Sequence, residues 1–151
     1  MRTTIDARQM LREASLRVTR PRIAVLESVH GLPHADTDSI IADVRRALPE
    51  VSHQTVYDSL RVLSTAGIVR KIQPAGSVAR YETRVGDNHH HVVCRVCGVV
   101  EDVDCAVGET VCLAPSDDHG FRIDEAEVVY WGLCPACRAQ AASTPTPDAH
   151  A

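Results

Sequence analysis

Residues 88–98 read NHHHVVCRVCG and place three histidines and two cysteines within one short segment. A second cysteine pair with the same CxxC spacing occurs in YWGLCPAC, residues 130–137. Two such pairs brought together give four thiolates in a tetrahedron, the closed ligand shell that structural zinc prefers. Iron in the same shell and two redox-active cysteine pairs are the alternatives. The spacing predicts a structural Zn²⁺ site formed by Cys94, Cys97, Cys134 and Cys137.

The histidines of the same segment favour a second, more exchangeable metal site. If the run is a strand, His89 and His91 face one side and His90 faces the other. Two imidazoles on one face can share a cation, and Glu82, Asp102 and His34 are candidate partners. Mixed nitrogen and oxygen ligands suit Fe²⁺, Mn²⁺ or Zn²⁺. Because His34 lies far from the others in sequence, one ion on this set would tie the two halves of the chain together.

The charge of the chain divides at about the same place. The overall net charge is −4, but residues 1–85 carry +4 and residues 86–151 carry −8. This asymmetry favours a basic, anion-binding module followed by an acidic one. The first residues are charged and lack an apolar signal segment, and no run is long enough to span a membrane. We therefore expect a cytoplasmic protein without membrane contact, in which six cysteines are metal ligands or redox groups rather than disulfides.

The first half predicts helices followed by a hairpin. An amphipathic segment covers residues 5–14, and Pro21 begins a helix that runs to about residue 30. Asp36 or Thr37 caps the next helix, and Ser52 caps a third that extends to Gly67. Two β-like runs, residues 68–73 and 78–83, follow around a Pro-Ala-Gly turn. This order is typical of a winged helix-turn-helix.

The second half predicts strands around the cysteine pairs. We expect a winged-helix domain over residues 1–83, a hinge over 84–88, a dimerisation and metal-binding domain over 89–139, and a disordered tail over 140–151. A helix over 105–116 would place Cys105 and Cys112 on one face as small buried residues. The fold class is α+β: an N-terminal winged helix-turn-helix and a C-terminal α/β domain with a four-cysteine zinc site.

Several motifs together resemble the ferric uptake regulator family over about residues 10–138. They are LRVTRPR, PHADTDSI, TVYDSLRVLSTAGIV, ARYE, HHHVVCRVCG and YWGLCPAC. The segments NHHHVVCRVCGVVEDVDCAVGE and EAEVVYWGLC further resemble the actinobacterial subgroup that represses catalase-peroxidase genes. The resemblance implies a homodimeric repressor that binds a double-stranded DNA operator, with no enzymatic activity and no small-molecule substrate.

The resemblance also assigns sites residue by residue. The regulatory metal falls on His34, Glu82, His89, His91 and Asp102. An additional family site keeps only His90 and Glu109, because Asn88 and Ala126 stand where ligands are usual, so we expect it to be weak or absent. The DNA contacts implied by the resemblance and by helix geometry are Arg17, Arg20, Ser52, Gln54, Thr55, Tyr57 and Arg61.

These inferences favour a metal-dependent, redox-responsive repressor of A/T-rich palindromic operators that controls peroxide defence, iron homeostasis or both. Its cofactors are structural Zn²⁺ and regulatory Fe²⁺ or Mn²⁺, for which Zn²⁺ can substitute. Zinc sensors of the family that the chain resembles tend to supply a hinge cysteine to the regulatory site, and no cysteine precedes Cys94 here, which disfavours zinc sensing. Glu82 stands where peroxide sensors of that family commonly carry aspartate. The alternatives are a DNA-binding protein regulated by Zn²⁺ or Mn²⁺ without peroxide sensing, a zinc hydrolase, and a zinc-stapled interaction module.

Overall fold

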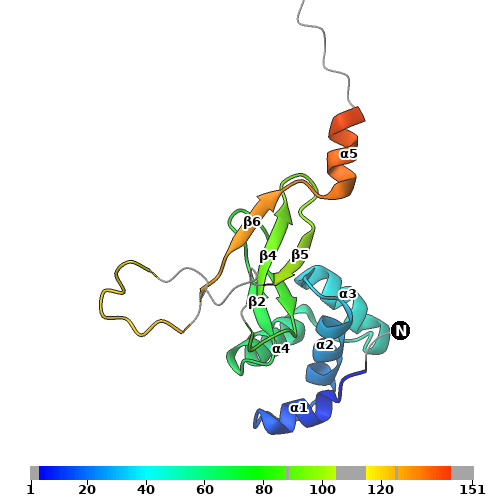
Figure 1. The fold of residues 1–151 in the computed structure, drawn as a ribbon. Coiled ribbons are helices and arrows are strands. Elements are labelled where there is room, and N and C mark those ends of the chain that lie inside the picture. Colours follow the sequence, from blue (N-terminus) through cyan, green and yellow to red (C-terminus); the bar gives the residue numbers. More distant parts are fainter. Residues whose placement is uncertain (1–3, 88, 105–114, 125, 144–151) are drawn as a thin grey trace, which may run out of the picture. The chain divides into compact units, whose positions relative to one another are not determined.

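The computed structural model describes residues 4–87, 89–104, 115–124 and 126–143. The chain divides into two compact units, Met1–Asp87 and Asn88–Ala151. The elements of the first unit are α1 (Ala7–Glu13), α2 (Arg20–Gly31), β1 (Ala35–Asp36), α3 (Thr37–Ala47), α4 (His53–Thr65), β2 (Arg70–Ile72) and β3 (Arg80–Glu82) (Figure 1). Helices followed by a hairpin confirm the predicted winged helix-turn-helix order.

Short polar residues fix where these helices begin. Asp6, Thr19, Asp36 and Ser52 precede α1 to α4, and each side chain accepts a hydrogen bond from the backbone N–H three residues later. This contact satisfies a donor that the first helical turn leaves without an intrahelical partner. Pro21 stands at the start of α2, where its missing N–H costs nothing. The predicted cap at Ser52 is confirmed, and Asp36 rather than Thr37 caps α3.

The core of the first unit lies between the apolar faces of its helices. The fully buried aliphatic side chains of α2, α3 and α4 are Val25, Leu26, Val29, Ile40, Val44, Val56, Leu60 and Leu63. Their spacing of three and four residues within each helix is the pattern of one buried stripe. The opposite face of α4 stays in solvent.

A three-stranded sheet of order β1-β3-β2 completes the first unit. Strands β2 and β3 form the predicted hairpin, with Lys71 opposite Tyr81. The sequence did not reveal β1, which pairs antiparallel with β3 and sets Ala35 opposite Tyr81. A two-residue strand carries no alternation of its own, so only its partner defines it.

The second unit is built on one central strand. Strand β4 (His89–Cys94) pairs antiparallel with β5 (Val100–Asp104) and parallel with β6 (Val129–Gly132). Helix α5 (Pro135–Ser143) follows β6. The parallel pairing is possible because the antiparallel strand β5 returns the chain to the end of the sheet where β4 begins, and β6 starts from that end on the other side of β4.

Two predictions for the second unit meet different outcomes. The predicted tail over 140–151 begins too early, because Gln140 to Ser143 belong to α5, whose alanine-rich sequence favours a helix. The described residues do not include the rest of the predicted tail, residues 144–151. They also leave out most of the predicted 105–116 helix, with Cys105 and Cys112. No helix among the described residues has both the length and the apolar content needed to cross a bilayer.

The cap of α3 gives a stability prediction. Hydrogen bonds from the side chain and backbone of Ser39 hold the pKa of Asp36 below its ordinary value of 3.8. The carboxylate therefore stabilises the fold fully above that value, and its contribution is lost as the pH falls further. We expect Asp36→Ala to lower the free energy of unfolding by about 1 kcal/mol at pH 7.

Urea unfolding at pH 7 and at a series of lower pH values measures this loss. The difference between wild type and Asp36→Ala should narrow below the unfolded-state pKa, whereas Asp36→Asn, which keeps an acceptor oxygen, should retain most of the stability at pH 7. Equal midpoints for wild type and the alanine variant at pH 7 would contradict the capping role.

Candidate metal centres and nucleic-acid interface

The four cysteine sulfurs of the second unit form one cluster. All four Sγ atoms of Cys94, Cys97, Cys134 and Cys137 lie within 4.8 Å of one another. The Sγ atoms of Cys97 and Cys134 are 3.7 Å apart, too far for a disulfide. Thiolates about 2.3 Å from a zinc ion at tetrahedral angles must be about 3.8 Å apart. The donor set and its spacing therefore fit a tetrahedral metal.

The parallel pairing of β4 and β6 brings the two cysteine pairs together. Cys94 is the last residue of β4 and pairs with Gly132, the last residue of β6, two residues before Cys134. Because parallel strands end at the same edge of a sheet, both CxxC turns form there. Gly98 closes the first turn at φ +73, a backbone angle that favours glycine. Its N–H donates to the carbonyl of Cys94 at 3.0 Å.

Backbone amides prepare one of these sulfurs to be a thiolate. The N–H of Cys134 donates to Cys94 Sγ at 3.4 Å, and with the amides of Cys97 and Val96 it lowers the pKa of Cys94 to about 6. The pKa of Cys137 is raised to about 12, first by its contact with Cys134 and then by burial. Several sulfurs this close hold protons between them unless a cation compensates their charge.

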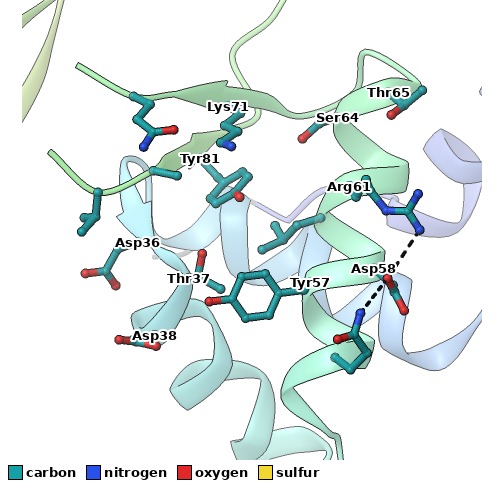
Figure 2. A pocket seen from close by; sticks show the side chains of 15 residues that line it. Asp36, Thr37, Asp38, Tyr57, Asp58, Arg61, Ser64, Thr65, Lys71 and Tyr81 are labelled. Carbon is teal, nitrogen blue, oxygen red and sulfur yellow. Dashed lines mark hydrogen bonds and ion pairs between the residues drawn. The ribbon is translucent and has the colours of Figure 1, made fainter. Parts of the chain in front are cut away.

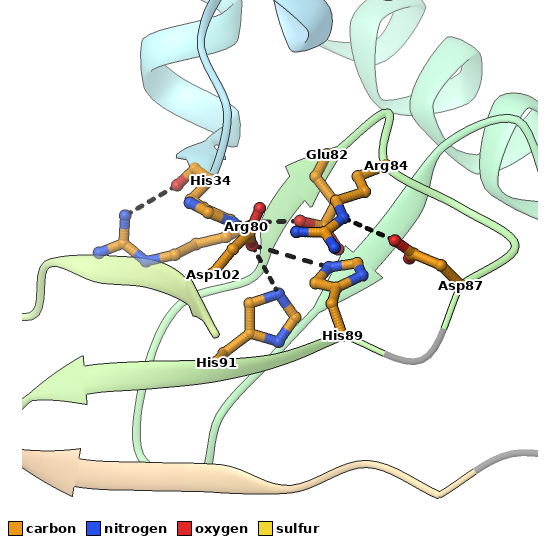
Figure 3. Close-up of polar contacts among 8 residues, drawn as sticks. All are labelled: His34, Arg80, Glu82, Arg84, Asp87, His89, His91 and Asp102. Atoms are coloured by element: carbon orange, nitrogen blue, oxygen red, sulfur yellow. Dashed lines mark hydrogen bonds and ion pairs between the residues drawn. The ribbon is translucent and has the colours of Figure 1, made fainter. Parts of the chain in front are cut away.

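The first unit sets His34 against Glu82. Because Ala35 pairs with Tyr81, the residues one step outward on β1 and β3 come opposite each other. His34 Nε2 lies 3.0 Å from Glu82 Oε2. Figure 3 marks this contact with a dashed line. The backbone at His34 has φ +62 and is held by its N–H to Tyr81 and by Arg80, whose guanidinium donates to its carbonyl at 3.0 Å. A non-glycine residue in this region stores backbone strain.

The second unit sets two imidazoles against one carboxylate. Strands β4 and β5 place Asp102 directly opposite His91, and His89 projects from the same face two residues earlier. The Nε2 atoms of His89 and His91 lie 3.6 and 3.4 Å from the same oxygen of Asp102 (Figure 3). Atoms that ligate one ion at about 2.1 Å must be roughly 3.0–3.5 Å apart. His91 and Asp102, like the His34–Glu82 pair, have the spacing of metal ligands, and His89 lies slightly beyond that range.

The additional site that the sequence raised is only partly described. His90 faces the side of the sheet opposite to its neighbours, as predicted, and its Nδ1 accepts a hydrogen bond from the N–H of Val128 at 3.3 Å. Glu109 lies outside the described residues. A weak or absent third site stays a prediction.

The predicted DNA contacts gather at the start and along the exposed face of α4. Arg20, Ser52 and Thr55 line a cleft of about 520 Å³ at its N-terminus. Gln54, Tyr57 and Arg61 line a second cleft of about 670 Å³, shown in Figure 2. Arg17 is exposed between α1 and α2 and is the one predicted contact that neither cleft includes.

Two of these predicted contacts also have a structural task. Ser52 Oγ accepts the N–H of Thr55 at 3.0 Å, and the two hydroxyl groups are 2.8 Å apart. Both side chains therefore build the cap of α4. Asp58 was not among the predicted contacts, and its Oδ1 contacts both Gln54 and Arg61. The four-residue and three-residue spacings from Asp58 were the sequence signal for these two interactions.

Comparisons with known proteins agree with these features. The ferric uptake regulator family model matches residues 13–131. The chain is 68% identical over 132 residues to the transcriptional regulator FurA of Mycobacterium tuberculosis, covering 87% of this chain and 90% of that protein. It is 64% identical over 140 residues to ferric uptake regulation protein 2 of Mycolicibacterium fortuitum, covering 91% and 96%.

A solved structure agrees as well. The Campylobacter jejuni peroxide stress regulator superposes with a TM-score of 0.64 at 26% identity, covering 88% of this chain and all of that one. The family match spans most of the chain, and the relatives are close over nearly their whole length. This chain therefore belongs to the ferric uptake regulator family of metal-binding, DNA-binding transcriptional regulators.

Proposed function

We propose that the chain is a homodimeric repressor whose affinity for an A/T-rich palindromic operator depends on a regulatory cation. The observation that carries the proposal is that each unit holds its own partial set of ligands. The first unit supplies His34 and Glu82 at 3.0 Å, and the second supplies His89 and His91 around Asp102. Ligands from both units on one cation would tie the units into a single arrangement.

The ligand chemistry favours Fe²⁺ or Mn²⁺ as the regulatory ion, with Zn²⁺ able to substitute. Imidazole and carboxylate donors suit all three ions, and no thiolate takes part that would select zinc. His34, Glu82, His89, His91 and Asp102 are the proposed ligands. When bound, the cation supplies charge compensation for two carboxylates and fixes the imidazole rings.

The cysteine cluster takes the structural role in this proposal. Four thiolates fill a tetrahedral shell and leave no position open for a reactant, so zinc there holds β4, β6 and the start of α5 together. Hydrogen bonds from backbone amides to the sulfur of Cys94 support this assignment, because they stabilise the thiolate that a metal requires.

The surface of the second unit supports a homodimer. Tyr130, Trp131 and Leu133 are large apolar residues on or just after β6, and each is about 36–47% exposed. Strand β6 is at one edge of the described sheet, and Arg95 lies over the Trp131 ring at 5.4 Å. Exposed apolar side chains beside a sheet edge are typical of an interface. Two copies would present two α4 helices to a palindromic operator, one per half-site.

Peroxide supplies the proposed release signal. The proposed ligands would hold a ferrous ion, which would supply redox catalysis for peroxide with no net loss of electrons from the metal. One oxygen atom of hydrogen peroxide adds to the imidazole of His34 or His89, and the other leaves as water, so the imidazole is oxidised by two electrons. The similarity to a peroxide stress regulator supports this step. An oxidised imidazole is a poorer ligand, so the repressor loses its cation. The cytoplasmic repressor then dissociates from the operator.

A second candidate keeps the DNA-binding and zinc assignments but uses Zn²⁺ or Mn²⁺ without peroxide sensing. Glu82 favours it, because peroxide sensors in the family commonly carry aspartate at the matching position. The hydrolase alternative is excluded by membership of a family of transcriptional regulators.

The structural zinc gives the first test. Cys94→Ser should remove about one zinc ion per chain and lower the melting temperature by roughly 10 °C or more, since structural zinc contributes much of the stability of a small domain. Metal analysis and thermal unfolding of the full chain measure both. Val96→Ser, a change between the two cysteines at a side chain that is 69% exposed, is the matched control and should keep its zinc. Zinc retained by Cys94→Ser would reject the assignment.

The regulatory site gives the second test. Mn²⁺ should tighten binding of the wild-type protein to an A/T-rich palindromic duplex by about 5- to 150-fold over chelated buffer. His89→Ala should remove this difference while leaving the zinc content unchanged. Fluorescence anisotropy measures the affinities, and His119→Ala, at an exposed histidine outside the clusters, should behave as wild type. Equal binding with and without Mn²⁺ in the wild type, or an unaffected His89→Ala, would contradict the switch.

Peroxide gives the third test. Brief exposure of the Fe²⁺-loaded protein to hydrogen peroxide should add the mass of one oxygen atom to the peptide that contains His34 or His89. The Mn²⁺-loaded protein should stay unmodified, because Mn²⁺ does not supply electrons as readily. Peptide mass spectrometry identifies the residue. Modification of cysteines alone, with zinc loss, would favour thiol oxidation, and no modification would favour the second candidate.

A further inference from the structure

Asp58 lies on the exposed face of α4, between two of the predicted DNA contacts. Its Oδ1 accepts a hydrogen bond from Gln54 Nε2 at 3.1 Å and pairs with Arg61 Nη2 at 3.4 Å. Figure 2 shows the side chains of Asp58 and Arg61 joined by a dashed line. Residues three and four apart share one face of a helix. We propose that Asp58 is a positioning residue for DNA reading, which orients the Gln54 amide toward adenine and restrains Arg61. This inference rests on the proposed operator binding, and it assigns to Asp58 an increase in base discrimination.

Stability does not account for this carboxylate. The side chains of Asp58 and Arg61 are 49% and 75% exposed, and ion pairs this open to water contribute little to folding. The buried face of α4, through Val56, Leu60 and Leu63, already holds the helix in the core. An acidic group on a helix that approaches phosphates also weakens binding to any DNA. A gain in discrimination is what offsets that cost.

The chemistry of the contact fixes which atoms Gln54 presents. A carboxylate only accepts hydrogen bonds, so the Gln54 amide must turn an N–H toward Asp58. The carbonyl oxygen and the second N–H then remain for a base edge. These are the acceptor and donor that pair with N6 and N7 of adenine in the major groove.

Without Asp58 the same amide is free to turn. Its NH₂ group could then face O6 or N7 of guanine, which both accept hydrogen bonds. Asp58 thus acts against guanine at one position of each half-site. It also compensates part of the Arg61 charge, so this arginine adds less to the sequence-independent attraction of phosphates.

Selection from a library of randomised DNA duplexes tests the inference. The full-length, Mn²⁺-loaded wild type should enrich a palindrome with adenine at one column in each half. Asp58→Ala, which removes the acceptor as well as the charge, should lower the adenine-to-guanine preference at that column by about 5- to 10-fold and leave the other columns unchanged. Its non-specific binding should depend more steeply on salt, by up to about one unit of log–log slope. Asp38→Ala is the matched control.

That control removes the same charge from the same cleft, but on α3, and should keep the wild-type preference at every column. A second pair of variants separates positioning from direct contact. In a Gln54→Ala background, Asp58→Ala should no longer change the column, because the amide that Asp58 orients is gone. Equal urea midpoints of wild type and Asp58→Ala would show that folding is not the cause.

Three outcomes overturn the inference. The first is an unchanged column in Asp58→Ala, and the second is the same relaxation in Asp38→Ala. The third is a change that persists in the Gln54→Ala background, which would mean that Asp58 touches the base itself. If the wild type enriches no sequence at all, the proposed operator binding is wrong and the inference is rejected with it. If the wild type enriches a palindrome and one of the three outcomes occurs, only the inference about Asp58 is rejected.

Discussion

Strand β4 is the element on which both ligand clusters of the second unit depend. Its first residue is His89 and its last is Cys94. Pairing with β5 brings Asp102 to the histidines, and pairing with β6 brings the second cysteine pair to Cys94. A shift of the register by one residue would turn every side chain of β4 to the other face and separate both clusters at once. Both clusters therefore require the correct register of β4 with β5 and with β6.

The first unit uses the same kind of constraint on a smaller scale. Two residues of β1 against β3 are enough to set His34 opposite Glu82. The cap at Asp36 begins α3 immediately after this contact, so the helix and the ligand pair share one anchor. The exposed face of α4 is anchored independently, by the packing of Leu60 and Leu63 in the core. The His34–Glu82 contact and the exposed face of α4 are thus set by different contacts within one unit.

Much of this was readable from the sequence, because the signals were local. The cap at Ser52, the apolar stripe of α4 and the CxxC spacing each depend on neighbours within a few residues. The alternation in HHHVVC also predicted correctly that His89 and His91 share a face. The parallel orientation of β6 and the existence of β1 depend on pairings between distant residues, and neither leaves a local pattern. Helix α5 was missed because its small residues resemble a linker.

The positive φ at His34 has a consequence for how the sequence evolves at this position. Glycine would adopt this backbone angle at no steric cost, and a histidine gives up about 1 kcal/mol there. Selection for fold stability alone would favour glycine at this position. Only selection for the imidazole itself would oppose that change, so a histidine at this position trades some stability of the fold for the function of its side chain.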